Sequence, residues 1–340
     1  MAGINGSAAH LSDTVFTTAI AVYALAMVGY TAEYAFGRRG RIAATSPIPA
    51  RELVRSGGGS VDSAGSRPDA ADPPLPPASK LALAERAGRS AVALTVLGVL
   101  LHALSITIRA AAVDAVPWSN MYEFASVAGL VGVIAFLGVL WKAPSIRHLG
   151  GFVLLPVVLT MFLAGTVLYS KAQPLVPALQ SYWLAIHVTL VSVAEGALMT
   201  SAVLTVLFLV KQRYDRRANR PGYQPGSLGT LASRLPPAET LDKVAYRIVA
   251  FAFPLYTVAI ICGAIWAEAA WGRYWGWDPK ETWAFIVWVV YACYLHARAT
   301  AGWKGRTAAW INLAGFGAIT FNFLIVNIVV SGLHSYAGLS

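Results

Sequence analysis

The chain alternates between long apolar segments and shorter polar ones. A helix needs about 20 residues to cross a hydrocarbon core of about 30 Å. Segments of this kind, with few charges, occupy residues 14–36, 90–112, 121–141, 150–170, 182–210, 244–267, 283–300 and 308–331. The pattern predicts an all-α, polytopic membrane bundle of about eight transmembrane helices.

Composition supports this class and excludes a water-soluble domain for most of the chain. Hydrophobic residues make up 57% of the 340 residues, and charged residues only 12%. Asp13 and the lack of a cluster of basic residues before the first span argue against a cleavable signal peptide. The first span is therefore expected to stay in the membrane.

The cations predict the orientation of the bundle. Of the 26 Lys and Arg residues, 22 fall in alternate connections: nine in 36–90, two in 141–150, eight in 211–247 and three in 298–308. The other connections hold only Arg109, Lys171, Arg273 and Lys280. Positive loops remain in the cytoplasm, so both termini are expected to be extracytoplasmic. The net charge of +10 then matches anionic lipid headgroups and requires no nucleic acid.

Three parts follow from this division. Residues 1–44 form an N-terminal transmembrane helix, and residues 45–88, with GGGS and PPLPP, form a flexible cytoplasmic linker. Residues 89–340 form a domain of seven helices. Within it we expect a cytoplasmic loop at 211–242 and an external loop at 268–282.

The external loop carries the most informative motif, WGRYWGWDPKETW at 271–283. Trp and Tyr also gather at the headgroup level of membrane proteins, so an interfacial belt is one interpretation. A belt needs only one or two aromatics per helix end and does not require the interleaved glycines. A flat aromatic platform for a large planar ligand fits the density of indoles better.

Four of the six histidines are candidate ligands. His102 and His296 lie within spans, where a polar side chain is costly and often functional. His187 lies near the outer end of its span, and His334 directly follows the last span. The four form an outer pair beside the aromatic loop and an inner pair within the bilayer. Each could instead simply hydrogen-bond a neighbouring helix.

Haem is the ligand that fits these residues best. Cys262 and Cys293 lie in separate spans and form no CxxC pair, and a zinc site would need three or four ligands. A haem needs only one or two axial imidazoles. Arg109, seven residues after His102 on the same helix face, could meet a haem propionate.

With these features the chain resembles the haem-handling WWD family. Its motifs follow the order of the CcsA/ResC branch, often called CcsB in actinobacteria, which acts in c-type cytochrome biogenesis. The resemblance covers residues 90–340 and rests on LLHALSITIRA, PWSNMYEF, SYWLAIHV, the WWD loop, YLHARAT and GLHSYAG. It implies haem b as substrate and bound ligand, and a bacterial plasma membrane location with the active site outside.

The resemblance also implies roles for individual residues. His187 and His334 would be the outer axial ligands of the haem iron, and His102 and His296 the inner ligands through which haem arrives. The outer platform would comprise Trp271, Gly272, Trp275, Gly276, Trp277 and Asp278. Asp278 would also act in catalysis, although Asp before Pro279 is equally a good N-cap for the next helix. Tyr122 and Glu123 belong to a family motif whose job the residues do not reveal.

The implied activity is that of a cytochrome c synthase, or haem lyase, subunit. Haem would cross the membrane and be presented for thioether attachment to the Cys-x-x-Cys-His segment of apocytochrome c. The implied partners are a ResB-type membrane protein, apocytochrome c, thiol-reducing proteins that act on it, and the lipid bilayer. Two alternatives remain open: a membrane electron-transfer cytochrome b with two bis-His haems, and a haem transporter without synthase activity.

Overall fold

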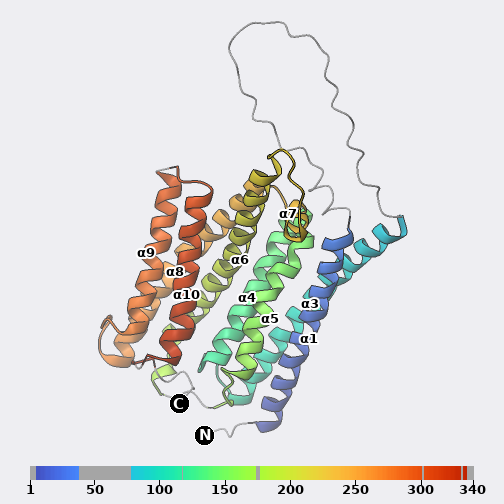
Figure 1. Cartoon of the computed structure of the whole chain (residues 1–340). Coiled ribbons are helices and arrows are strands. Elements are labelled where there is room, and N and C mark those ends of the chain that lie inside the picture. Colours follow the sequence, from blue (N-terminus) through green and yellow to red (C-terminus); the bar gives the residue numbers. More distant parts are fainter. Residues whose placement is uncertain are drawn as a thin grey trace, which may run out of the picture.

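The computed structural model describes residues 5–37, 78–116, 118–173, 177–300, 302–330 and 332–334. All regular structure in these ranges is helical, which confirms the all-α class. The helices are α1 (Gly6–Phe36), α3 (Ala78–Val113), α4 (Met121–Lys142), η1 (Pro144–Leu149), α5 (Gly150–Thr166), η2 (Pro177–Leu179), α6 (Tyr182–Ala218), α7 (Ser227–Ser233), α8 (Ala238–Trp271), α9 (Pro279–Ala299) and α10 (Arg306–Ile328). They stand side by side in one bundle (Figure 1).

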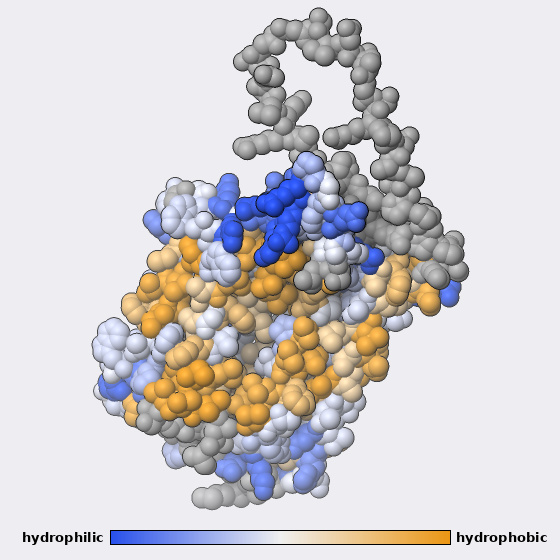
Figure 2. All heavy atoms as spheres, viewed as in Figure 1, coloured by the Kyte–Doolittle hydropathy of each residue, from blue (hydrophilic) through white to orange (hydrophobic). Residues whose placement is uncertain are grey.

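Seven of the described helices are long and apolar enough to cross a membrane: α1, α3, α4, α5 with the end of η1, α6, α8 and α10. The eighth predicted span forms helix α9, but its Trp, Tyr, His and Arg residues leave it less apolar than these seven. Figure 2 shows hydrophobic residues across the middle of the visible face and hydrophilic residues at its two ends. The chain is a multi-pass membrane protein.

Three predicted boundaries differ from the structure. The external loop predicted at 268–282 covers only 272–278, because α8 runs on to Trp271 and α9 begins at Pro279. Helix α3 begins at Ala78, so residues 78–88 of the predicted linker are helical, because no Gly or Pro interrupts them before Gly88. Helix α6 runs on to Ala218, into the predicted 211–242 loop, which also contains α7. The rest of the predicted linker, residues 45–77 with GGGS and PPLPP, lies outside the described residues.

Small residues let neighbouring helices of the bundle approach each other closely. In the pair α1 and α3, the hydroxyls of Ser12 and Ser105 each donate to the other residue's carbonyl at 3.0 Å. A Cβ on Gly98 would lie 2.4 Å from the ring of Tyr23 on α1. Between α4 and α6, a Cβ on Gly196 would lie 2.8 Å from the Ala128 carbonyl. This is the close backbone packing expected of helices in lipid.

The start of α1 and the end of α10 lie at the same end of the bundle (Figure 1). At this end the backbone N–H of Asn5 donates to the Ala112 carbonyl at 3.0 Å, which joins α1 to α3. The loop from α8 to α9 lies here as well, because Asp278 contacts His334. We call this the N/C end of the bundle.

Candidate functional site

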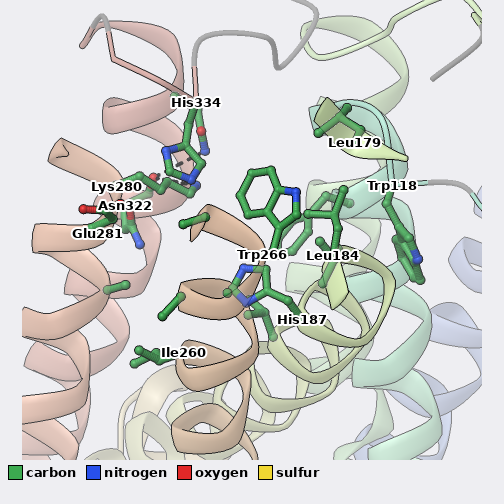
Figure 3. Close-up of a pocket in the computed structure, with 18 of the residues that line it drawn as sticks. Trp118, Leu179, Leu184, His187, Ile260, Trp266, Lys280, Glu281, Asn322 and His334 are labelled. Carbon is green, nitrogen blue, oxygen red and sulfur yellow. Dashed lines mark hydrogen bonds between the residues drawn. The ribbon is translucent and has the colours of Figure 1, made fainter. Parts of the chain in front are cut away.

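A cavity opens at the N/C end between α4, α6, α8, α9 and α10. Its empty volume, counted together with the open space at its mouth, is about 1160 Å³. Most of its lining is apolar or aromatic. His187 and His334 both line it, together with Trp266, Trp271 and Trp275 (Figure 3). The structure thus brings the predicted outer pair of histidines to one cavity.

His187 is held in a defined orientation by α8. It lies in the second turn of α6, and its Nδ1 is 2.7 Å from the carbonyl oxygen of Ala259. A carbonyl can only accept a hydrogen bond, so Nδ1 carries the proton and the lone pair of the neutral ring lies on Nε2. The ring packs directly against Gly263, where a Cβ would lie 2.6 Å from it. Gly263 therefore makes room for the imidazole.

His334 is oriented in the same way by a carboxylate. Its Nδ1 lies 2.9 Å from Oδ2 of Asp278. The other carboxylate oxygen, Oδ1, accepts the backbone N–H of Leu333 at 2.8 Å. Burial alone would raise the pKa of the Asp278 carboxyl, but hydrogen bonds from His334 and Leu333 lower that pKa to about 2. An ionised carboxylate only accepts, so the neutral imidazole donates from Nδ1 and carries its lone pair on Nε2.

Asp278 also begins helix α9. Its side chain accepts the Lys280 backbone N–H at 3.3 Å, and Pro279 occupies the first helical position. Glu281 completes a capping box, because its Oε2 accepts the N–H groups of Asp278 at 3.1 Å and Gly276 at 2.8 Å. Capping and orientation of His334 are therefore two jobs of one carboxylate.

The tryptophans of the loop are divided between the cavity and the surface. The Trp271 ring lies 5.1 Å from the His334 ring, edge to face, and 4.7 Å from Trp266, which the sequence analysis did not single out. Trp277 does not line the cavity. It is 66% exposed and packs against Trp275 and Phe285 with ring centroids at 5.8 and 6.2 Å.

Two backbone positions shape this loop. Gly272 ends α8 in the left-handed region, with φ of 71°, where a glycine carries no Cβ penalty. Trp277 adopts a positive φ of 58°, a conformation that is uncommon for a non-glycine residue. Gly276 lies under the guanidinium of Arg273, since a Cβ there would overlap that group. Neither of these two glycines lines the cavity.

The predicted inner pair of histidines is not brought together. His102 is fully buried on α3, with Nε2 2.9 Å from the Ser126 hydroxyl of α4 and its ring edge against Phe16 of α1. His296 is exposed on α9, which packs against α8 and α10. Helices α3 and α9 stand on opposite sides of the bundle (Figure 1), so the two residues form no common site within this chain.

Arg109 also lies away from the cavity. Its Nε donates to Glu123 at 2.7 Å, another guanidinium nitrogen lies 3.5 Å from Asp13, and its charge lies over the Tyr122 ring at 4.5 Å. It is only 2% exposed. A buried guanidinium needs paired charges, and Glu123 and Asp13 supply them. This arrangement gives Tyr122 and Glu123 a structural role: they join α4 to α3 at the N/C end.

Sequence analysis missed several polar residues that line the cavity, among them Glu195, Lys280 and Asn322. Glu195 offered a signal, since it is an acidic residue in the middle of the apolar segment 182–210. Asn322 offered less, because its segment, 308–331, also holds Asn312 and Asn327. Cys262 and Cys293 are free thiols, as their positions suggested.

The donor set suits a ligand that brings most of its own coordination. In the described ranges, no group of three His, Cys, Asp or Glu residues is arranged to hold a bare metal ion. A porphyrin supplies four nitrogens to its iron, so two imidazoles complete the coordination. The aromatic lining of the cavity suits the flat face of such a ligand.

Comparison with known proteins identifies a family. The sequence profile of the family described as "Cytochrome C assembly protein" matches residues 118–334, which include the whole cavity region. A cytochrome c biogenesis protein CcsA of Gloeobacter violaceus is 38% identical over 299 residues, covering 74% of this chain and 86% of the relative. CcsA of Trieres chinensis is 38% identical over 247 residues, covering 66% and 78%. CcsA of Synechococcus elongatus is 42% identical over 199 residues, covering 49% and 61%.

Proposed function

Because this chain belongs to the cytochrome C assembly protein family, with a CcsA-type role in cytochrome c biogenesis, we propose that it conducts haem across the membrane and presents it in the cavity to apocytochrome c. One observation carries the proposal. His187 and His334 line one aromatic cavity, and each ring donates from Nδ1, so that Nε2 is the nitrogen that would bind iron.

In the proposed reaction this chain binds and orients, and haem and apocytochrome c are the substrates. Each cysteine thiol of the Cys-x-x-Cys-His segment adds across a vinyl group. The sulfur bonds to one vinyl carbon and a hydrogen to the other, so no net oxidation occurs. The substrate histidine then replaces His187 or His334 on the iron. Holding vinyl and thiol close together accounts for much of the rate, as positioning can lower a barrier by roughly 7–11 kcal/mol.

The proposal includes a location and partners. The distribution of cations along the sequence, 22 of 26 in the connections that follow α1, α4, α6 and α9, favours an extracytoplasmic cavity in a bacterial plasma membrane. The connections at this end that are described in full are short, such as 272–278 between α8 and α9. A ResB-type membrane protein with an external domain would guide apocytochrome c, and thiol-reducing proteins would keep its cysteines reduced.

An electron-transfer cytochrome b is less well supported. That function requires a second pair of axial histidines in the bilayer, and the helices that carry His102 and His296, α3 and α9, stand on opposite sides of the bundle (Figure 1). To test the proposal, this chain, a ResB-type partner and an apocytochrome c are produced in cells that lack their own assembly system. We expect haem that remains attached to the cytochrome under denaturing conditions only when this chain is present. Equal attachment in cells without this chain would refute the proposal. Haem that the purified chain keeps and that quinol reduces would favour the cytochrome b instead.

Gly263 provides a direct test of how His187 is positioned. Gly263→Ala places a Cβ 2.6 Å from the His187 ring, which must move away from Ala259. We expect haem affinity to fall at least about tenfold, because small misplacements of a binding group are costly. The measurement is a haem titration of the purified protein by absorbance.

Gly138→Ala on α4 is the matched control for that experiment. Nothing lies within 4 Å of a Cβ at Gly138, so the same helix-favouring change should leave haem binding unaltered. If Gly263→Ala bound haem as tightly as Gly138→Ala, the His187 ring would not be the ligand positioned at this contact.

A further inference from the structure

One side of the cavity is polar. Lys280 and Glu281 line it from α9, Asn322 from α10 and Glu195 from α6. Figure 3 shows Lys280, Glu281 and Asn322 together on one side, while Trp118, Leu179 and Leu184 lie on the other. The two histidines and Trp266 lie between these groups in the view. The cavity therefore has two chemically different sides.

Lys280 is placed where a structural role does not account for its charge. It occupies the second position of α9, and the N-terminal end of a helix disfavours a cation. Its Nζ donates a long hydrogen bond of 3.4 Å to the backbone carbonyl oxygen of Asn322. Across the described ranges, no carboxylate lies within 4.0 Å of this ammonium group.

The acidic residues near Lys280 are mostly engaged elsewhere. Glu195 and Asp278 are the negative charges that act on it. The Asp278 carboxylate binds His334 and Leu333, and Glu281 binds the N–H groups of Gly276 and Asp278. Glu195 lines the same cavity from α6 and makes none of these bonds. An ammonium group that is largely removed from water needs an anionic partner, and no carboxylate of the described residues is in contact with this one.

Asn322 gives an independent sign of a missing partner. It is only 4% exposed, and within the described part of the chain its Oδ1 has no hydrogen-bond partner. Buried polar atoms of amides are nearly always paired, so an unpaired one on a cavity wall indicates a polar group of a ligand. The oxygen as placed would need a donor, but half a turn of the amide puts its NH₂ group at the same position, where it can donate to a carboxylate.

We propose that Lys280, assisted by the Asn322 amide, binds a propionate carboxylate of the haem and thereby fixes which edge of the porphyrin faces which side of the cavity. This inference rests on the proposed function. The propionate edge lies against α9 and α10. The vinyl edge then faces Trp118, Leu179 and Leu184. Ser119 and Asn120 also line the cavity beside Trp118, but their side chains are hydrogen-bonded to Glu123 and to each other. Apocytochrome c would reach the vinyl groups from the side of η2 and the start of α4.

Esterified haem separates this role from a structural one. The purified protein is titrated with haem and with haem dimethyl ester, whose propionates carry no charge. A charge-assisted hydrogen bond is worth enough for Lys280→Met to weaken haem binding roughly tenfold or more. Binding of the dimethyl ester should be unchanged by Lys280→Met. Lys280→Arg, which keeps the charge, should retain most of the preference for haem.

Lys171→Met is the matched control, since it removes an exposed lysine at the same end of the bundle. It should leave both titrations unaltered. Equal weakening of haem and diester binding by Lys280→Met would overturn the inference, as would no weakening of either. If the unmodified protein bound both porphyrins but did not prefer haem, the inference alone would fail. If it bound neither with the spectrum of two axial imidazoles, the proposed function would fail with it.

Discussion

Replacing His187 or His334 by alanine is expected to abolish the low-spin haem spectrum of the purified protein and the formation of holocytochrome c. Both rings line the same cavity, and each is a proposed axial ligand of the haem iron. Loss of a partner that only orients a metal-binding histidine typically lowers metal affinity about 10–100-fold, so loss of the ligand itself should exceed that range. The measurements are the absorbance spectrum and the covalently attached haem on the cytochrome.

Free imidazole distinguishes ligand loss from misfolding. Each alanine leaves a space beside the iron that imidazole can fill, so millimolar imidazole should restore the low-spin spectrum. His10→Ala is the control, because His10 is an exposed residue on α1. A variant that bound haem with an unchanged low-spin spectrum would rule out that histidine as an axial ligand.

Asp278→Asn is expected to lower haem affinity about 10–100-fold, mainly through His334. Asparagine is as good an N-cap as aspartate, so α9 should still begin at Pro279. However, the asparagine amide can donate to Nδ1 of His334, which stabilises the tautomer whose lone pair is not on Nε2. The negative charge of the carboxylate is also lost, and this charge makes the ligand nitrogen of His334 more basic. Haem titration measures the effect.

The pH dependence of the unmodified protein follows from the same carboxylate. Because the folded-state pKa of Asp278 is lowered to about 2 from 3.8, its contribution to stability is present above about pH 4 and is lost as the pH falls towards 2. Asp278 is therefore ionised at neutral pH, and we expect the wild-type haem spectrum to stay constant there.

Asp242→Asn, which breaks an ion pair with Arg298 away from the cavity, is the control variant for the Asp278→Asn titration. Unchanged affinity in Asp278→Asn would show that the carboxylate does not act through His334.

The local sequence was sufficient to predict the helices and the placement of the outer pair of histidines at one cavity. Helix formation in a membrane depends on length and apolar content, which are read directly from a segment. The prediction of an all-α membrane bundle is confirmed, and the family resemblance is confirmed by the match over residues 118–334. His187 and His334 flank a loop dense in tryptophan, so their placement at one cavity required only that the spans alternate in direction.

The angular position of each helix and its choice of neighbours were decided by tertiary packing. Counting residues gives the depth of His102 and His296 in the bilayer, but depth does not say which helices stand side by side. Arg109 likewise has the depth for a propionate, yet Glu123 and Asp13 come from two packed helices and pair with it. That Lys280, Asn322 and Glu195 line one cavity depends on the packing of α10 against both α9 and α6. The sequence by itself therefore determined the spans, the aromatic loop and the outer pair of histidines, because these depend on local composition. Only the fold decided which polar groups share the cavity, because burial of a charge is satisfied through contacts between helices.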